Sequence, residues 1–447
     1  MRTLIAKTLI ERTLIVCCAI LIALPSEAKQ CEFTLSTPQP VLIAGKKQTT
    51  AVKIAVKGFE MNSKKERAPL NVALVIDRSG SMSGKKIERA KEAAIQAIQR
   101  LESNDIVSVV TYDSHVKVLI PATKVSNLEG MERTIHSIQP GETTALYAGT
   151  EKGADEVRKF FEKGIVNRVV LLSDGLANVG PSSPAELAEL GRKLGGKGIS
   201  VTTLGLGSDY NEDLMVKLAS SSDGNHKFIE SADEMADIFQ KEFNTALSVV
   251  AQDVRCVVTL PKGIRPVRAL NMDADIKERE VTFGWNQIYS NHERFLMLEV
   301  EVPATSDGSS FELATATLKY TNVETKNTDS LSARVDVRFS DSEGQVKDSI
   351  VKSVMEDYVE LIAYLDNKKA MELRDSGDIE GAQRLFRSNS RFLESNAFGL
   401  GGSARLQRSA ITNSTNADEA AASAAEWNNA RKRMVEGQNT TGLQQKY

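Results

Sequence analysis

The spacing of hydrophobic and polar positions changes several times along the chain, and each change marks a boundary between structural units. From residue 29 to residue 69, polar and apolar side chains alternate, as in the segment from Ala51 to Val56. Alternation with a period of two is typical of β-strands with one buried face. From residue 70 to residue 249, the apolar positions form continuous runs that are separated by segments with helical spacing.

The segment 70–249 is predicted to fold as an α/β domain. Its apolar runs suit strands buried on both faces, and they cover residues 72–76, 106–110, 169–172 and 201–205. The segments with helical spacing between and after them cover residues 87–101, 145–162, 183–195, 211–221 and 232–247. Strands that alternate with helices form a mainly parallel sheet covered on both faces. A Rossmann-like fold is therefore expected.

The period of two returns from residue 250 to residue 343, as in Phe295-Leu296-Met297-Leu298. This pattern predicts the larger part of a β-sandwich, to which residues 29–69 supply the remaining strands. The α/β domain would then be inserted between strands of one sandwich.

The end of the chain has two further patterns. Residues 344–397 have helical spacing that is broken at Ser376-Gly377-Asp378, which predicts a helical hairpin with Asp378 as an N-cap. Residues 398–447 are rich in Gly, Ser, Asn, Ala and Gln and contain few large apolar residues. This composition predicts a low-complexity, disordered tail with a possible short helix from about Glu419 to Val435.

Residues 1–28 have the pattern of a signal peptide. Basic residues precede an apolar run from Thr13 to Leu24, and the small residue Ala28 ends a suitable cleavage site. A membrane-spanning helix needs about 20 apolar residues, which is more than this run provides. We therefore expect export to the periplasm or the extracellular space, with no stable membrane span in the mature chain.

Cys31 and Cys256 are the two cysteines of the predicted mature chain. In an oxidising compartment, an even pair favours a disulfide bond, and two buried free thiols are the alternative. Both lie in segments assigned to the same sandwich, so a bond between them would agree with the inserted layout.

Charge narrows the classes of partner. The formal net charge is -3, and no concentrated basic surface is visible in the sequence, which argues against a nucleic-acid partner. The short basic runs Lys85-Lys86 and Arg431-Lys432-Arg433 are expected to be solvated surface.

Three short polar segments stand beside predicted strand or helix ends. They are Asp77-Arg78-Ser79-Gly80-Ser81, Gly141-Glu142-Thr143-Thr144-Ala145 and Ser173-Asp174-Gly175. Loops at the carboxyl ends of parallel strands converge in one crevice, so the three segments can meet there. Hydroxyl and carboxylate oxygens are hard ligands that suit Mg²⁺ in octahedral geometry. The sequence therefore predicts a divalent-metal site.

These segments resemble the metal ion-dependent adhesion site of the von Willebrand factor A family, which begins with Asp-x-Ser-x-Ser. The layout is similar to that of exported bacterial A-domain proteins and of inter-alpha-trypsin inhibitor heavy chains. The resemblance implies that Ser79, Ser81 and Thr144 bind the ion directly, whereas Asp77 and Asp174 act through bound waters. Thr143 remains the alternative to Thr144. The implied ion is Mg²⁺, with Mn²⁺ or Ca²⁺ as alternatives.

Neutral direct ligands compensate the charge of such an ion poorly, so it favours an anionic oxygen from outside the chain. The leading hypothesis is therefore an exported, non-enzymatic adhesion or scaffold module that captures an Asp or Glu of a protein partner. The alternative is a metal-assisted hydrolase that uses Asp77 as nucleophile. Against it, Ser79 stands where a second carboxylate is needed, and none of the four histidines lies in a zinc-binding HExxH pattern.

Overall fold

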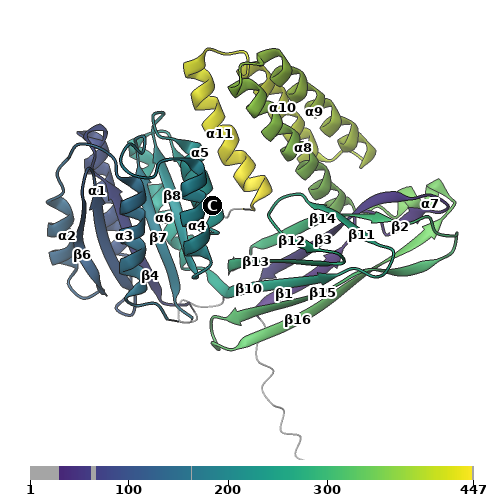
Figure 1. The fold of residues 1–447 in the computed structure, drawn as a ribbon, viewed down its shortest axis with the longest axis horizontal. Coiled ribbons are helices and arrows are strands. Elements are labelled where there is room, and N and C mark those ends of the chain that lie inside the picture. The colour runs from purple at the N-terminus through teal and green to yellow at the C-terminus, as the bar shows by residue number, and fades with distance from the viewer. Residues whose placement is uncertain (1–29, 62–66, 163, 445–447) are drawn as a thin grey trace, which may run out of the picture.

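The computed structural model describes residues 30–61, 67–162 and 164–444, and the predicted signal peptide at residues 1–28 lies outside them. The described chain forms an α/β domain, a β-sandwich and a C-terminal bundle of helices (Figure 1). In this view the α/β domain and the sandwich lie side by side, and the bundle stands above the place where they meet.

The α/β domain is built on one six-stranded sheet, with the strand order β6-β5-β4-β7-β8-β9. The strands are β4 (Leu70–Asp77), β5 (Ile106–Tyr112), β6 (Val116–Lys124), β7 (Val166–Ser173), β8 (Ile199–Leu206) and β9 (His226–Ile229). All neighbouring strands are parallel except the edge strand β6, which runs antiparallel to β5. The predicted mainly parallel sheet is confirmed, and β6 was not anticipated.

Helices cover both faces of this sheet. One layer contains α1 (Lys85–Ile98), α2 (Leu128–His136) and α6 (Met235–Ala246), and the other contains α3 (Leu146–Arg158), α4 (Pro184–Gly195) and α5 (Glu212–Ser221). Successive residues of β4 face opposite layers, so that Leu74 lies in one core and Val75 in the other. A strand buried on both faces explains the continuous apolar run that predicted it.

The sandwich consists of a four-stranded sheet, β1-β3-β14-β11, and a six-stranded sheet, β12-β13-β10-β15-β16-β2. Its strands are β1 (Cys31–Ser36), β2 (Val41–Ile43), β3 (Gln48–Gly58), β10 (Val249–Thr259), β11 (Arg265–Ala269), β12 (Asp275–Lys277), β13 (Glu280–Tyr289), β14 (Glu293–Val302), β15 (Ser310–Asn322) and β16 (Thr328–Ser340). Strand β3 pairs with β14 along its length, from Lys57 opposite Glu293 to Gln48 opposite Val302. Strands on both sides of the α/β domain therefore share one sheet, which confirms the predicted insertion.

Cys31 and Cys256 are both buried in the core of the sandwich, where burial raises the pKa of each thiol to about 12. Both are free thiols, so the structure does not contain the predicted disulfide bond. Their place in one core agrees with the inserted layout without requiring the bond.

The C-terminal helices are α7 (Glu343–Asp348), α8 (Lys352–Asp375), α9 (Ile379–Gly399), α10 (Ala404–Glu419) and α11 (Ala424–Gly442). The predicted hairpin corresponds to α8 and α9, and the Asp378 carboxylate accepts the Gly381 amide hydrogen at 2.8 Å as the N-cap. The predicted disorder was wrong for residues 398–444, because α10 and α11 are ordered helices, and the short helix expected around residues 419–435 corresponds to part of α11. Small residues such as Ala410, Ala417 and Ala430 are buried there, so close packing replaces large apolar side chains.

Helix α11 also packs against the α/β domain. The Lys432 ammonium is 1% exposed and lies 2.7 Å from the Glu212 carboxylate of α5. Arg431 pairs with Asp213 at 2.9 Å, and the Asn428 amide donates to the Ser208 carbonyl at 2.9 Å. The expectation that residues 431–433 are solvated surface was wrong for Arg431 and Lys432, because both pair with Glu212, which lies 219 and 220 positions earlier in the chain.

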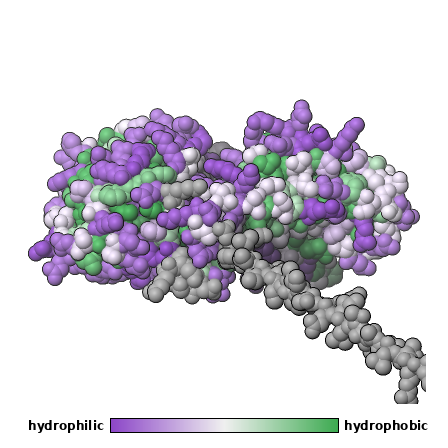
Figure 2. Space-filling view, turned by 90° about the horizontal axis from the view of Figure 1, so that it is seen from below, coloured by the Kyte–Doolittle hydropathy of each residue, from purple (hydrophilic) through white to green (hydrophobic). Residues whose placement is uncertain are grey.

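Hydrophilic side chains cover much of the visible face of both larger bodies, with hydrophobic side chains scattered among them (Figure 2). Partly exposed hydrophobic residues occur singly on folded proteins without special meaning. Within the described ranges, no helix is both long enough and apolar enough to cross a membrane.

Candidate functional site

Three loops meet at the carboxyl edge of the α/β sheet. Strand β4 ends at Asp77 and is followed by a 3-10 turn (η2, Gly80–Met82) that leads into α1. Strand β7 ends at Ser173, and the loop at residues 141–145 leads into α3. The Gly80 amide donates to the Glu142 carbonyl at 2.9 Å, which fixes the first loop to the third. The structure thus brings together all three segments that the sequence singled out.

The hydroxyl groups of Ser79, Ser81 and Thr144 converge on one point. The oxygens of Ser79 and Ser81 are 3.1 Å apart. A Cβ atom added to Gly175 would lie 3.4 Å from the hydroxyl oxygens of Ser81 and Thr144 and 3.9 Å from that of Ser79. The glycine at position 175 therefore leaves open the space that all three oxygens border.

This spacing fits an octahedral Mg²⁺ ion. Neighbouring oxygens in such a shell are about 3.0 Å apart, which is √2 times a metal–oxygen distance of about 2.1 Å. The Ser79 and Ser81 hydroxyls, which are hydrogen-bonded to each other at 3.1 Å, are at a distance compatible with this value. The donor set is also suitable, because Mg²⁺ prefers hard oxygen ligands.

Asp77 lies behind these hydroxyls and is completely buried. One carboxylate oxygen accepts the Ser79 amide hydrogen at 2.8 Å, and the other accepts the Ser173 hydroxyl hydrogen at 2.7 Å. Burial raises the pKa of Asp77 to about 6, and the hydrogen bonds from Ser173 and Ser79 oppose this rise. A divalent ion at the hydroxyls of Ser79, Ser81 and Thr144 would stabilise the ionised form of this buried carboxylate.

Asp174 is also fully buried, and both of its oxygens have partners. One accepts the Ser81 hydroxyl hydrogen at 2.7 Å, and the other forms an ion pair with the Lys86 ammonium. The expectation that Lys85-Lys86 is solvated surface was therefore wrong for Lys86. Lys86 lies in the first turn of α1, and its sequence gives no sign that a carboxylate at the end of β7 is its partner.

The two adjacent threonines have different surroundings. Thr144 is buried, its hydroxyl borders the Gly175 space, and its amide donates to the Asn178 side chain at 2.8 Å. Thr143 is exposed, and its hydroxyl donates to Ser114 at 2.8 Å. Of the two alternatives left by the sequence, the geometry favours Thr144.

The loop at residues 141–145 is held beside an ion pair that the sequence did not reveal. Arg78 and Asp113 form an ion pair at 2.6 Å. A Cβ atom at position 141 would lie 1.9 Å from the Asp113 carboxylate, so only glycine fits beside this pair. The single glycine before the two threonines is thus explained by the close approach of Asp113, whose position could not be inferred from one sequence.

No group of three or more His, Cys, Asp or Glu side chains suited to a metal occurs within the described residues. The candidate centre therefore depends on serine and threonine hydroxyls with two carboxylates behind them.

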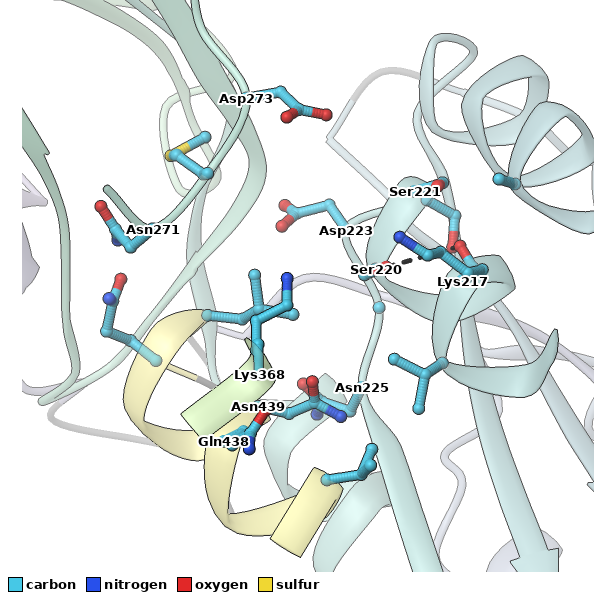
Figure 3. A pocket seen from close by; sticks show the side chains of 18 of the residues that line it. Lys217, Ser220, Ser221, Asp223, Asn225, Asn271, Asp273, Lys368, Gln438 and Asn439 are labelled. Carbon is cyan, nitrogen blue, oxygen red and sulfur yellow. Dashed lines mark hydrogen bonds between the residues drawn. The ribbon is translucent and has the colours of Figure 1, made fainter. Parts of the chain in front are cut away.

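A separate hollow of 1190 Å³ lies where the three parts of the chain meet (Figure 3). Lys217 and Asp223 reach it from the α/β domain, Asp273 from the sandwich and Lys368 from α8. An Arg294–Asp223 ion pair at 2.8 Å links the sandwich to the α/β domain at its wall. We interpret this hollow as the joint between the three parts.

Residues 71–241 match the family described as von Willebrand factor type A domain. The Synechocystis protein sll0103 is 26% identical over 73% of this chain and 79% of its own length. Escherichia coli YfbK is 29% identical over 47% of this chain and 37% of its own length. Human inter-alpha-trypsin inhibitor heavy chain H3 is 30% identical over 35% of this chain and 18% of its own length. The likeness to YfbK and H3 thus covers less than half of either protein.

Two solved structures share the fold over most of the chain. A von Willebrand factor type A protein from Catenulispora acidiphila has a TM-score of 0.69 at 16% identity, covering 87% of this chain and 90% of that one. The ArnB paralog VWA2 from Sulfolobus acidocaldarius has a TM-score of 0.62 at 16% identity, covering 93% and 99%. At this identity, the agreement concerns the fold alone.

Proposed function

Because this chain carries a von Willebrand factor type A domain, a family that commonly mediates metal-dependent protein interactions, we propose that it is a metal-dependent protein-binding module. In this proposal Ser79, Ser81 and Thr144 hold the ion directly, and Asp77 and Asp174 hold it through water. Mg²⁺ is the proposed ion, with Mn²⁺ or Ca²⁺ as substitutes. The bound ion supplies a Lewis-acidic, positively charged point that attracts an Asp or Glu of the partner.

One observation carries this proposal: three neutral hydroxyls border a single open space, and the nearest carboxylates lie buried behind them. Because the three direct ligands are neutral, they do not compensate the double positive charge of the ion. An anionic oxygen from a second molecule is therefore the favourable last ligand. This role is adhesion or scaffolding, without a chemical step.

The hydrolase alternative has less support. Asp77 is completely buried, and both of its oxygens accept hydrogen bonds from Ser79 and Ser173. A nucleophile must reach its substrate, and a general base must stand beside the reacting group. Asp77 does not meet the first requirement.

We further propose that the chain works outside the cytoplasm, in the periplasm or the extracellular space. The support is the signal-like pattern of residues 1–28. Cell fractionation with an antibody against the α/β domain tests this, and recovery only from the cytoplasmic fraction contradicts it.

A metal-dependent capture experiment tests the binding role. The full chain is immobilised and exposed to the native envelope fraction or medium in Mg²⁺, in EDTA, and in EDTA followed by excess Mg²⁺. A partner that is bound in Mg²⁺, released by EDTA and rebound with Mg²⁺ supports the proposal. Replacing one acidic residue of that partner by its amide should then abolish capture.

Matched serine variants provide the control. Ser79→Ala removes one of the converging hydroxyls, whereas Ser83→Ala alters an exposed serine just after the 3-10 turn. Capture should be lost only in the first. Capture that resists both EDTA and Ser79→Ala contradicts the proposal and points to another docking surface.

A further inference from the structure

We propose that Lys86 is a built-in cation that occupies the acidic half of the metal centre when no metal is bound and therefore sets the affinity for the metal. This inference rests on the proposed metal centre and adds a residue that controls it. It predicts that a bound divalent ion replaces the Lys86 ammonium as the positive charge beside Asp174.

The contact that carries the inference is the ion pair between Lys86 and Asp174. Asp174 is 0% exposed, and its second oxygen is already bonded to the Ser81 hydroxyl at 2.7 Å. A buried carboxylate without a positive partner is costly, so Lys86 stabilises the metal-free centre. The side chain of Lys86 is 32% exposed, which leaves its ammonium a path outward to solvent.

A divalent ion at the converging hydroxyls would conflict with Lys86 in two ways. The ion and its waters need Asp174, whose Oδ2 is engaged by the Lys86 ammonium while its Oδ1 accepts the Ser81 hydroxyl hydrogen. Two positive charges in one small site also repel each other. Metal binding thus has to displace Lys86, and the free energy of breaking its ion pair with Asp174 opposes metal affinity.

The neighbouring lysine shows that this role is specific to one position. Lys85 has the same side chain but is 64% exposed, and it pairs with the exposed Asp233 at 2.6 Å. Lys85 immediately precedes Lys86 in the first turn of α1, but its ion pair is with Asp233 and not with Asp174. Lys85 therefore provides a matched control with identical chemistry and a different partner.

Calorimetric titration of Mg²⁺ into the full chain, together with thermal unfolding in EDTA, tests the inference. Lys86→Met should lower the Kd for Mg²⁺ by about tenfold, which corresponds to about 1.4 kcal/mol. The same variant should unfold a few degrees lower than wild type in EDTA, because Asp174 then has no positive partner. Lys85→Met should leave both values unchanged.

Two further variants separate charge from shape. Lys86→Gln replaces the charged side chain by a neutral polar one, so this variant should bind Mg²⁺ as tightly as Lys86→Met. It can replace Lys86→Met in the titration if the latter does not fold. Lys86→Arg keeps the charge and should retain the wild-type Kd. Equal constants for wild type, Lys86→Met and Lys86→Gln overturn this inference alone, whereas no Mg²⁺ binding by wild type overturns the metal centre and the inference together.

Discussion

Neighbouring threonines at positions 143 and 144 differ in what their hydroxyls face. That of Thr144 borders the Gly175 space, and that of Thr143 is bonded to Ser114 at the surface. We predict that Thr144→Ala removes most of the Mg²⁺-dependent rise in melting temperature, because one direct ligand is lost. Thr143→Ala should keep that rise. Thermal melts with and without Mg²⁺ decide it, and the opposite ranking would assign the ligand to Thr143.

His226, the first residue of β9, provides a pH-dependent test. Its ring contacts the Thr203 hydroxyl at 2.9 Å and the Tyr210 hydroxyl at 3.3 Å, and burial lowers its pKa to about 3. Nearby Glu212 raises this pKa, and Lys432 and Lys227 lower it. Between pH 6.5 and 3, the unfolded chain therefore binds a proton that the folded chain does not, and stability falls as the pH falls.

The loss from this residue is at most about 1.4 kcal/mol per pH unit within that window. Urea unfolding at several pH values between 7 and 4 measures it. His226→Asn, which keeps a polar group near Thr203, should have a shallower pH dependence than wild type. Identical slopes for the two proteins would show that His226 titrates normally in the folded state.

Single residues also show where inference from the sequence stops. The sequence predicts that Asp77, Ser79, Ser81 and Asp174 meet in one crevice, and they lie together in the fold because loops at the carboxyl ends of parallel strands converge. Lys86 was assigned to solvent, because its partner is reached only through the fold. A local charge pattern contains no information about a carboxylate 88 positions away.

At the scale of elements, α3 is positioned by its own glycines. A Cβ atom at Gly149 would lie 2.8 Å from the Tyr112 ring, and one at Gly153 would lie 2.4 Å from a Val75 methyl group. The absence of side chains at these positions lets α3 approach the sheet closely. Because α3 begins two residues after Thr144, this approach also fixes the Thr144 hydroxyl beside Gly175.

Gly153→Ala should therefore destabilise the chain by about 1–3 kcal/mol, because the added methyl group overpacks the contact with β4. Gly437→Ala is the control, since this helical glycine of α11 has no atom within 4 Å of an added Cβ. It should be neutral or stabilising by up to about 1 kcal/mol. Chemical unfolding of both variants measures the difference, and equal effects would contradict the close approach of α3.

Of the last two helices, α10 was missed, and α11 was expected only as a short helix in a disordered tail. Residues 398–447 lack large apolar side chains, so composition indicated disorder. Yet Ser423 and Glu426 form a capping box at the start of α11, a signal that is readable in the sequence. Buried alanines and the buried Trp427 then pack these helices against α8 and α9. Only the bundle itself shows that small residues suffice there.

At the scale of the whole molecule, α11 ties the helical bundle to the α/β domain through Lys432 and Glu212. Lys432→Met should lower the free energy of unfolding by about 1–3 kcal/mol, because Glu212 keeps only its pair with Arg431. Arg433→Met is the control, since Arg433 pairs with Glu419 at the surface. Its effect should stay below about 1 kcal/mol. Equal losses in urea unfolding would show that α11 does not stabilise the junction.

The inserted layout was visible in the sequence because the period of two stops at one point and resumes at another. The contact between α11 and α5 was not, since Arg431 and Lys432 resemble any short basic run until Glu212 and Asp213 are placed beside them. Periodicity thus predicts layers, whereas contacts between layers depend on geometry that only the folded chain provides.

The metal centre itself is tested most directly by anomalous scattering from crystals of the full chain grown in Mn²⁺, which takes the same oxygen ligands as Mg²⁺. We predict one strong peak about 2.0–2.3 Å from the hydroxyl oxygens of Ser79, Ser81 and Thr144. The peak should be absent from crystals of Ser79→Ala grown in the same solution. A wild-type crystal with no peak at these oxygens, or with its manganese bound elsewhere, would contradict the proposed centre.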